Sequence, residues 1–424
     1  MIYKTYKCNS FNVYTIKTDR FKTAHLEIQF RKKAVKEEMG KYAFLADALS
    51  ESTKNYPRRK DLIIKFEELY KSICYASTIR TGNVLTFNVS LDFINPKYIN
   101  KDNYLESVIK IVLEMLQNPN VTNDEFDLKT FNIVKDRIER ELNSLKENPV
   151  KQSIKKAFET MGGDTPTIFE LLGTREELEK LTPGDLYKAY KKLFKDFVCD
   201  VFVIGDFDMD EFVTILKKYF KNRYINEEKF NFLVDNKETK KEHVGSLDSD
   251  NVQASLVMIY NTNNLDKIES NITMHVFNYL FGNGGLTCKL YQSLREKNSL
   301  CYAISSMYLK YDGLLLIQVS LEQENVKKAI SLIKKELKAM QLGDFKDEEV
   351  KDAINNMIVS LDLAGDNNIA ILNNYVFNCL DDLPLLEERK ELFKKVTKDD
   401  VVKVAKKIKI NTIFTLNGKE NNHE

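Results

Sequence analysis

Two segments near the start of the chain, residues 11–18 and 23–30, alternate between hydrophobic and polar positions. Period-two alternation predicts β-strands, and the two residues between them give a hairpin-like spacing. From about residue 37 the hydrophobic spacing becomes helical. The positions that fall on one face of this predicted helix are Tyr42, Leu45, Ala46 and Leu49.

The same reasoning extends over the rest of the first half. It predicts helices over residues 62–71, 104–117, 123–146, 150–172 (with a break at Gly162 and Gly163) and 183–194, and strands over residues 74–80, 84–93 and 198–204. Residues 124–125 would lie in the first turn of their helix, where acidic side chains suit the helix dipole. Thr182 followed by Pro183 and Asp185 predicts a capped helix start. The polar segment 226–250 is predicted to be a linker.

A glycine cluster marks the second half: Gly282, Asn283, Gly284 and Gly285. Glycine tolerates positive φ and close approach of other groups, and asparagine shares some of this tolerance. A turn is the simplest interpretation of these four residues alone. A phosphate-binding loop is not predicted, because neither a Gly-Lys-Ser/Thr ending nor the G-x-G-x-x-G spacing is present. The pattern then predicts a helix over residues 286–296 and strands over residues 301–307 and 313–321.

Short segments of the first half recur in the second half in the same order. Residues 74–76, 89–91 and 180–186 correspond to residues 301–303, 319–321 and 395–401, and another short strand follows at 412–416. This recurrence indicates an internal duplication. Hairpins mixed with long helices, outside a strict βαβ rhythm, favour an α+β fold. We therefore predict two homologous halves, residues 1–225 and 251–424, each an antiparallel-rich sheet layered with long helices and joined by the 226–250 linker.

Composition narrows the classes of partner. The 424 residues exceed one ordinary domain. The 64 Lys and Arg nearly balance the 63 Asp and Glu, so we expect neither nucleic acid nor an anionic membrane as partner. Six scattered cysteines without a CxxC pair indicate a reducing compartment. No signal-peptide pattern and no run of eighteen apolar residues is present, so a cytoplasmic location is expected.

The segment from Leu290 to Ser306 resembles the second-half signature of the pitrilysin/insulinase family of zinc peptidases, the inverted zincins. In that family a glycine-rich loop precedes the pattern L-F-x-x-L-R-E-x-x-G-L-A-Y-x-V-S-S. Residues 173–178 also look like the family's L-G-T-x-E-x-I motif. The resemblance covers essentially the whole chain. It implies two α+β halves hinged like a clamshell, a glycine-rich loop (residues 282–285) that contacts substrate, and an Arg/Tyr pair, Arg295 and Tyr302.

The zinc motif of the family, H-x-x-E-H, is missing. Its positions are occupied by Ala43, Ala46 and Asp47. Glu141 stands where the family has its third ligand, but without histidine partners we interpret it as an exposed or salt-bridged residue. The family's other acidic position is Val134. The four histidines (25, 243, 275 and 423) are isolated, and His275 lies on an apolar helix, where a core or surface role is expected. No metal or other cofactor is therefore expected in this chain.

Some family members are heterodimers in which one chain carries zinc and the other does not. By this resemblance the chain is a non-catalytic subunit, with peptide as substrate and a zinc-bearing homologous subunit as partner. Arg295 would hydrogen-bond the substrate's backbone carbonyl or a carboxylate, and Tyr302 would assist oxyanion stabilisation near the scissile bond. On a purely structural interpretation, Arg295 would pair with Glu296 or Glu322 and Tyr302 would be a core aromatic.

Two alternatives remain open. The chain could be a catalytically inactive peptide-binding or scaffold protein of the same fold, or an active enzyme with a displaced metal site, which four isolated histidines disfavour. Residues 18–23, 54–57 and 69–70 resemble more narrowly a Gram-positive bacterial subgroup of elongation-factor-P-modification-associated, or peptide-maturation, peptidase homologues. Members of that subgroup commonly occur beside a partner with an intact zinc motif.

Overall fold

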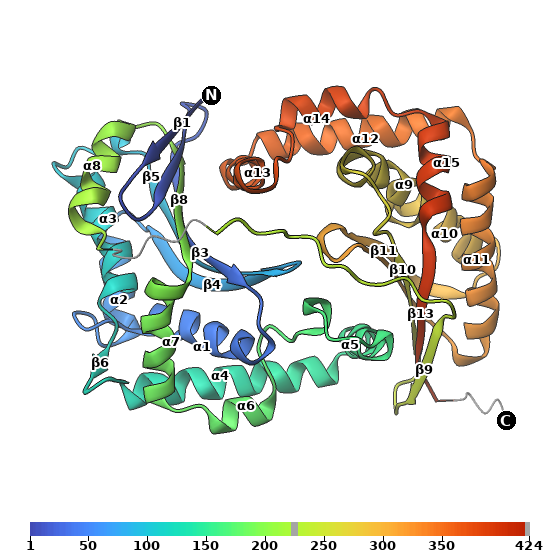
Figure 1. Cartoon of the computed structure of the whole chain (residues 1–424), viewed down its shortest axis with the longest axis horizontal. Helices are drawn as coiled ribbons and strands as arrows, with labels where there is room; N and C mark the ends of the chain where they lie inside the picture. Colours follow the sequence, from blue (N-terminus) through green and yellow to red (C-terminus); the bar gives the residue numbers. More distant parts are fainter. Residues whose placement is uncertain (222–227, 420–424) are drawn as a thin grey trace. The chain divides into compact units, whose positions relative to one another are not determined.

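The computed structural model describes residues 1–221 and 228–419 (Figure 1). The chain divides into two compact units, and each combines segments that are distant in sequence. Unit 1 comprises Met1–Leu142, Phe169–Phe232 and Asn367–Asp382. Unit 2 comprises Asn143–Ile168, Leu233–Asp366 and Leu383–Glu424.

Unit 1 is built on a six-stranded sheet in the order β1-β2-β8-β3-β5-β4. Its strands are β1 (Ile2–Lys7), β2 (Asn12–Lys17), β3 (Thr23–Lys33), β4 (Ile73–Thr81), β5 (Val84–Ile94) and β8 (Val198–Gly205). All neighbouring pairs are antiparallel except β2 with β8, which are parallel. The N-terminal strand β1 was not predicted from the hydrophobic pattern. It is an edge strand with mostly exposed side chains, so it lacks the alternation that marks a half-buried strand.

Unit 2 contains a five-stranded sheet in the order β11-β12-β10-β13-β9. Its strands are β9 (His243–Asp248), β10 (Ala254–Asn261), β11 (Cys301–Leu309), β12 (Leu314–Leu321) and β13 (Lys409–Asn417). Only β13 and β9 are parallel. Without β1, the first sheet read from β4 has the same order and the same single parallel pair. This correspondence confirms the predicted α+β fold of two homologous halves.

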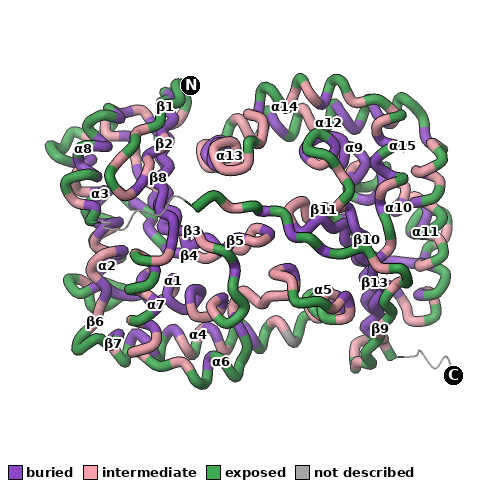
Figure 2. The backbone as a smooth tube through the Cα atoms, viewed as in Figure 1, coloured by how far each residue is buried: buried purple, intermediate pink, exposed green. Residues whose placement is uncertain are grey.

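Helices cover both sheets. Those of unit 1 are α1 (Met39–Glu51), α2 (Arg59–Glu68), α3 (Tyr104–Gln117), α4 (Leu128–Glu147, which continues into unit 2), α6 (Arg175–Lys180), α7 (Pro183–Asp196) and α8 (Met209–Tyr219). Those of unit 2 include α9 (Met274–Asn278), α10 (Lys289–Tyr291), α11 (Val326–Leu342), α12 (Asp347–Gly365), α14 (Leu386–Phe393) and α15 (Lys398–Lys407). Buried positions are concentrated in the strands and exposed positions on outer helix faces (Figure 2).

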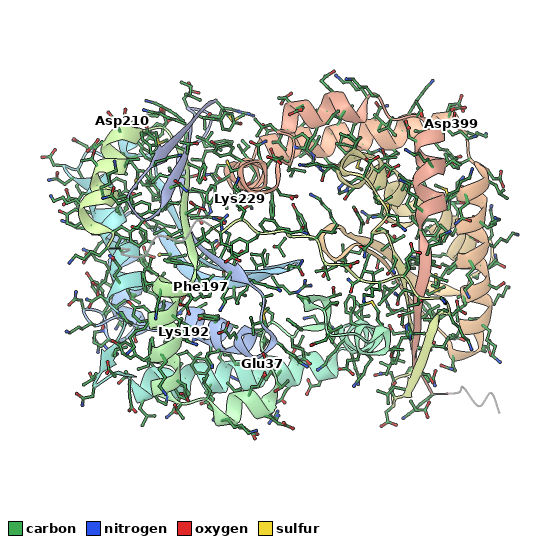
Figure 3. All side chains as sticks on the ribbon, in the orientation of Figure 1. Glu37, Lys192, Phe197, Asp210, Lys229 and Asp399 are labelled. Atoms are coloured by element: carbon green, nitrogen blue, oxygen red, sulfur yellow. The ribbon has the colours of Figure 1, made fainter. Side chains whose placement is uncertain are left out.

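The helix start predicted at Thr182 is confirmed, and its counterpart in the second half is capped in the same way. The Thr182 side chain accepts a hydrogen bond from the Asp185 backbone N–H at 3.2 Å, with Pro183 in the first turn of α7. Thr397 and Asp400 form a capping box at the start of α15. Asp399, in the same turn, marks this end of the helix in Figure 3.

Each sheet is covered by one helix from the other half of the sequence. Helix α5 (Pro149–Met161), encoded in the first half, packs on the second sheet through Ala157 and Met161, against Val257 and Phe414. Helix α13 (Asn368–Asp381), encoded in the second half, contacts β8 and β3 of the first sheet. The compact units therefore do not coincide with the contiguous halves of the sequence.

Three local predictions were wrong. The helix predicted from residue 123 begins only at Leu128, because Asn123 and Asp124 adopt positive φ in a two-residue turn between β6 (Val121–Thr122) and β7 (Glu125–Phe126). The segment 286–296 is a 3-10 turn and the short α10, followed by a π-helical turn at Gln292–Glu296, rather than one α-helix. The predicted linker 226–250 contains β9, and its residues 226 and 227 lie outside the described part of the chain.

Candidate functional site

The positions of the zinc motif lie on α1 in unit 1. Ala43 is 9% exposed and Ala46 is 2% exposed. A methyl side chain offers no atom that binds a metal ion, so neither residue replaces the histidine or glutamate that the motif requires. Asp47 alone has a ligating group, and its carboxylate is partly exposed. Within the described residues, no group of three or more His, Cys, Asp or Glu side chains is placed to hold a metal ion.

A guanidinium group lies against α1 where the motif would have its metal-binding face. Arg137 of α4 contacts Glu51 of α1, with Nη2 to Oε2 at 2.5 Å, and its Nη1 is 3.7 Å from Oδ2 of Asp47. Arg59 also approaches Glu51, at 3.4 Å. Burial raises the pKa of Asp47, while the charge of Arg137 acts in the opposite direction. The residues present therefore do not fit a zinc ion; they form a salt-bridge cluster that joins α1 to α4.

Glu141 lies one helical turn after Arg137 on α4 and is exposed. Its charge is among the groups that raise the pKa of Asp47, so the two carboxylates are within electrostatic reach of one another. Val134, at the family's other acidic position, is fully buried. The sequence interpretation did not identify Arg137. Its only sequence signal is the spacing of four residues before Glu141, which places both side chains on one face of the helix.

The histidines are dispersed through the fold. His25 is buried in β3, where Nδ1 lies 2.7 Å from Oδ1 of Asp92 and Nε2 lies 3.1 Å from Oε1 of Glu27. His243 is exposed in β9, and His275 is in α9. His423 lies outside the described residues. The sequence interpretation missed the His25 triad, because strand alternation does not reveal that the polar face of β3 is buried.

The glycine-rich loop in unit 2 has a packing or backbone reason for each glycine. A Cβ atom at Gly282 would lie 2.5 Å from the Cβ of Ser306 in β11, and one at Gly284 would lie 2.6 Å from the carbonyl oxygen of Tyr279. Gly285 has φ of +61°, in the left-handed region. Asn283 is exposed between them. Close packing of the loop backbone against neighbouring residues, and the left-handed conformation of Gly285, therefore account for the glycines of this loop.

Arg295 and Tyr302 lie together at the beginning of β11. Arg295 occupies the π-helical turn Gln292–Glu296, and its Nη1 donates a 3.0 Å hydrogen bond to the carbonyl oxygen of Tyr302. Its guanidinium also lies over the Tyr291 ring, 5.1 Å from the ring centroid. Tyr302 falls in an irregularity of the β11–β12 register, between Cys301 and Ala303, and is 61% exposed. Such bulges redirect side chains and occur often beside functional sites.

This geometry differs from the purely structural interpretation of the pair. Tyr302 is too exposed to be a core aromatic. Among the described residues, no ion pair joins Arg295 to Glu296 or Glu322, and its hydrogen bond goes to the backbone. One bond occupies one of the five N–H donors of a guanidinium. The other donors of Arg295 are free of this bond. Both side chains are exposed, Tyr302 at the start of the terminal strand β11 and Arg295 in the turn before it.

The loop and the pair are connected through shared neighbours. Gln292, the first residue of the π-helical turn, donates from Nε2 to the carbonyl oxygen of Leu286 at 2.7 Å. The Ser306 hydroxyl donates to Oδ1 of Asn278 at 2.5 Å, which ties β11 to the helical segment before the loop. The sequence identified the glycine-rich loop and the Arg295–Tyr302 pair. It did not identify Gln292 and Ser306, whose hydrogen bonds connect the two regions.

Comparisons with known proteins concern the family and the fold. Residues 180–357 match the family model described as the Peptidase M16 inactive domain. A protein of Bacillus subtilis (strain 168), described as a probable inactive metalloprotease, YmfF, is 26% identical over 424 residues, covering 98% of this chain and 97% of that protein.

Two solved structures share the fold. A conserved protein from Enterococcus faecalis V583 superimposes with a TM-score of 0.92 at 24% identity, over 99% of both chains. The peptidase M16 inactive domain from Pseudomonas fluorescens superimposes with a TM-score of 0.78 at 16% identity, over 99% of this chain and 98% of that one.

The fold and the degenerate metal site define an inactive homologue of a metallopeptidase. The match over residues 180–357 and the similarity along the whole chain are to the M16 peptidase family, the pitrilysin/insulinase family that its second-half signature resembles. In the described part of the chain, no helix is both long enough and apolar enough to cross a membrane.

Proposed function

We propose that this chain is the non-catalytic subunit of a heterodimeric metallopeptidase. It would bind peptide substrate through Arg295, Tyr302 and the loop at Gly282–Gly285, and a homologous subunit with an intact zinc motif would carry out hydrolysis. The observation that carries the proposal is the exposed Arg295–Tyr302 pair at the end of β11. The zinc-motif positions of this chain provide no metal site, so the chemistry is assigned to the partner.

The position of the pair on a terminal strand supports peptide as the ligand. Strand β11 is the last strand of its sheet. An extended peptide adds to such an edge through backbone hydrogen bonds, while side chains beside the edge select its sequence. A guanidinium donates well to a peptide carbonyl or a carboxylate, and a phenol donates to a developing oxyanion. Tyr75, the counterpart of Tyr302 in the repeat, is also exposed on the terminal strand β4 of the first sheet.

The cysteines support a reducing location for this complex. All six are free thiols, and four of them are buried. This usage is typical of proteins in the cytoplasm, where we propose that the subunit acts on peptides.

The second candidate function is a peptide-binding or scaffold role without hydrolysis. The glycine-rich loop favours it, because packing and backbone conformation explain Gly282, Gly284 and Gly285 without any substrate. The two functions differ in whether a zinc-bearing homologue depends on this chain for peptide cleavage.

Cleavage of a mixed pool of unstructured peptides distinguishes them. The samples are this chain, a zinc-motif homologue from the same organism, and the two combined. We expect cleavage only in the combined sample, and at least a tenfold lower rate when this chain carries Arg295→Ala. Equal cleavage by the homologue alone would reject the subunit role and leave the scaffold role. Metal analysis of the purified chain tests the displaced-site alternative, for which bound zinc would be required.

A further inference from the structure

A second cluster of basic and aromatic side chains lies at the opposite end of β11 from Tyr302. Tyr308 is near the end of that strand, and Lys310 and Tyr311 lie in the 3-10 turn that follows it. His275 of α9 packs edge-to-face against Tyr308, with ring centroids 5.6 Å apart. Arg389 of α14 completes the cluster, within electrostatic reach of both Tyr311 and His275.

Within residues 1–221 and 228–419, Arg389 has no acceptor for its buried N–H group. Its Nε atom is inaccessible to solvent and has no hydrogen-bond partner among the described residues. Burial lowers the pKa of Arg389, and among the described residues no carboxylate counteracts this effect; the one other contributing group there is Tyr311. A buried cation that lacks a partner is unfavourable, and the penalty is relieved when an anion binds to it. The side chain as a whole is partly exposed, so an anion from solvent could reach it.

The groups around Arg389 include an imidazole that carries no charge at pH 7. Burial is the main cause that lowers the pKa of His275, to about 4, and the charges of Arg389 and Lys310 lower it further. His275 is therefore neutral at pH 7. Lys310 places its Nζ 3.0 Å from the Tyr311 hydroxyl. The cluster thus combines cationic groups with phenol and imidazole groups.

The next residue of the same helix shows the usual arrangement. Lys390 contacts Asp362 at 2.5 Å and Glu387 at 2.8 Å, so its charge is neutralised within the protein. Arg389, which is more buried by its neighbours, has no such carboxylate among the described residues. The difference between two adjacent cations indicates that the charge of Arg389 is available to a ligand.

We propose that Arg389 forms, with Tyr311 and Lys310 beside it, a binding site for an oxyanion, and that this oxyanion is a carboxylate of a bound peptide. The oxyanion site stands on the cluster alone, whereas the peptide as its source rests on the proposed function. A strand rises by about 3.3 Å per residue, so the eight steps from Tyr302 to Lys310 span about 27 Å. A peptide of about nine residues paired along β11 would contact Tyr302 at one end and place a terminal or acidic carboxylate at Arg389 at the other.

The first test measures the oxyanion site without any peptide. Thermal unfolding is followed in sodium chloride and in sodium acetate or phosphate at equal ionic strength, for the native chain and for Arg389→Met. Methionine keeps much of the apolar stem of arginine and removes its charge. Acetate and phosphate should raise the melting temperature of the native chain by about 1–3 °C relative to chloride, because a ligand of the folded state stabilises it.

The variants decide whether Arg389 is responsible. Arg389→Met should lose this response and, in chloride, should melt at or above the native temperature, because an unpaired buried charge has been removed. Lys390→Met, the adjacent control, should keep the native response. An equal response of the native chain and Arg389→Met to acetate and phosphate would overturn the proposal.

The second test identifies the source of the oxyanion. Binding of a nonapeptide with a free C-terminus is compared with that of its C-terminal amide, neither containing Asp or Glu. We expect the amide to bind about tenfold more weakly to the native chain and the two to bind equally to Arg389→Met. Equal binding to the native chain, with the acetate and phosphate response retained, would reject the peptide carboxylate and leave a free oxyanion as ligand. Failure of both peptides to bind, with that response retained, would contradict the proposed function and not the oxyanion site.

Discussion

Arg295 holds the backbone at Tyr302 through a 3.0 Å hydrogen bond from Nη1 to the carbonyl oxygen. The same side chain is thus both an anchor for the irregular start of β11 and a candidate contact for peptide. Removal of the guanidinium would therefore change the position of Tyr302 as well as the charge of the site. Tyr302 would lose only its hydroxyl in a Tyr302→Phe variant, and the anchor would remain.

These roles predict different sizes of effect on peptide binding. Arg295→Ala should weaken binding of an unstructured peptide at least tenfold, and Tyr302→Phe should weaken it severalfold, as measured by fluorescence anisotropy. Lys297→Ala removes an exposed cation two residues after Arg295 and should leave binding within twofold. If Lys297→Ala weakens binding as much as Arg295→Ala, general charge rather than the anchored pair is responsible.

The cluster that occupies the former metal site should contribute to stability. In Arg137→Ala the nearly buried Glu51 carboxylate would keep, of its ion pairs with described residues, only the longer contact with Arg59. We expect a loss of about 1–3 kcal/mol in the free energy of unfolding, measured by urea denaturation, because a buried carboxylate loses its main partner. The double variant Arg137→Ala/Glu51→Gln should recover part of this loss. Arg140→Ala, at an exposed position on the same helix, should change stability by less than about 0.5 kcal/mol.

The buried His25 triad predicts a decline of stability at alkaline pH. Burial by itself lowers the pKa of His25, but hydrogen bonds to Asp92 and Glu27 raise it to about 9. Below the unfolded pKa of about 6.5 both states are protonated, and the stabilisation is complete. Between about pH 6.5 and 9 only the folded state keeps the proton, so stability falls as pH rises.

The triad prediction is tested with His25→Gln. Urea unfolding between pH 6 and 9.5 should show a decline of about 1–3 kcal/mol for the native chain that is absent from this variant. His243→Gln, at an exposed position of β9, should behave like the native chain. A flat profile for the native chain would show that the triad does not hold a proton more tightly in the folded state.

Ser299 occupies the place of a glycine in the family signature and has φ of +52°. A left-handed conformation is unfavourable by about 1–2 kcal/mol for a residue with a side chain. Ser299→Gly should therefore stabilise the chain by up to about 1 kcal/mol, despite the greater freedom of glycine in the unfolded state. Ser305→Gly, within β11, should instead destabilise it. A lower unfolding midpoint for Ser299→Gly would contradict this interpretation.

The sequence by itself determined the local features whose causes are local. Period-two alternation predicted β3 and β5, and the order Thr182-Pro183 predicted the start of α7, because side-chain direction and backbone capping act within a few residues. The motif match identified the family, and the alanines at positions 43 and 46 were sufficient to show that the zinc motif is absent.

Only the tertiary structure decided which distant groups meet. It placed α5 and α13 on the sheet of the other half, buried His25 between two carboxylates, and brought Arg137 against Glu51 and Asp47. In the described part of the chain, it also left Arg389 without a carboxylate while its neighbour Lys390 has two. Pairing and burial depend on contacts between residues far apart in the chain, and no local pattern of hydrophobic and polar positions encodes them.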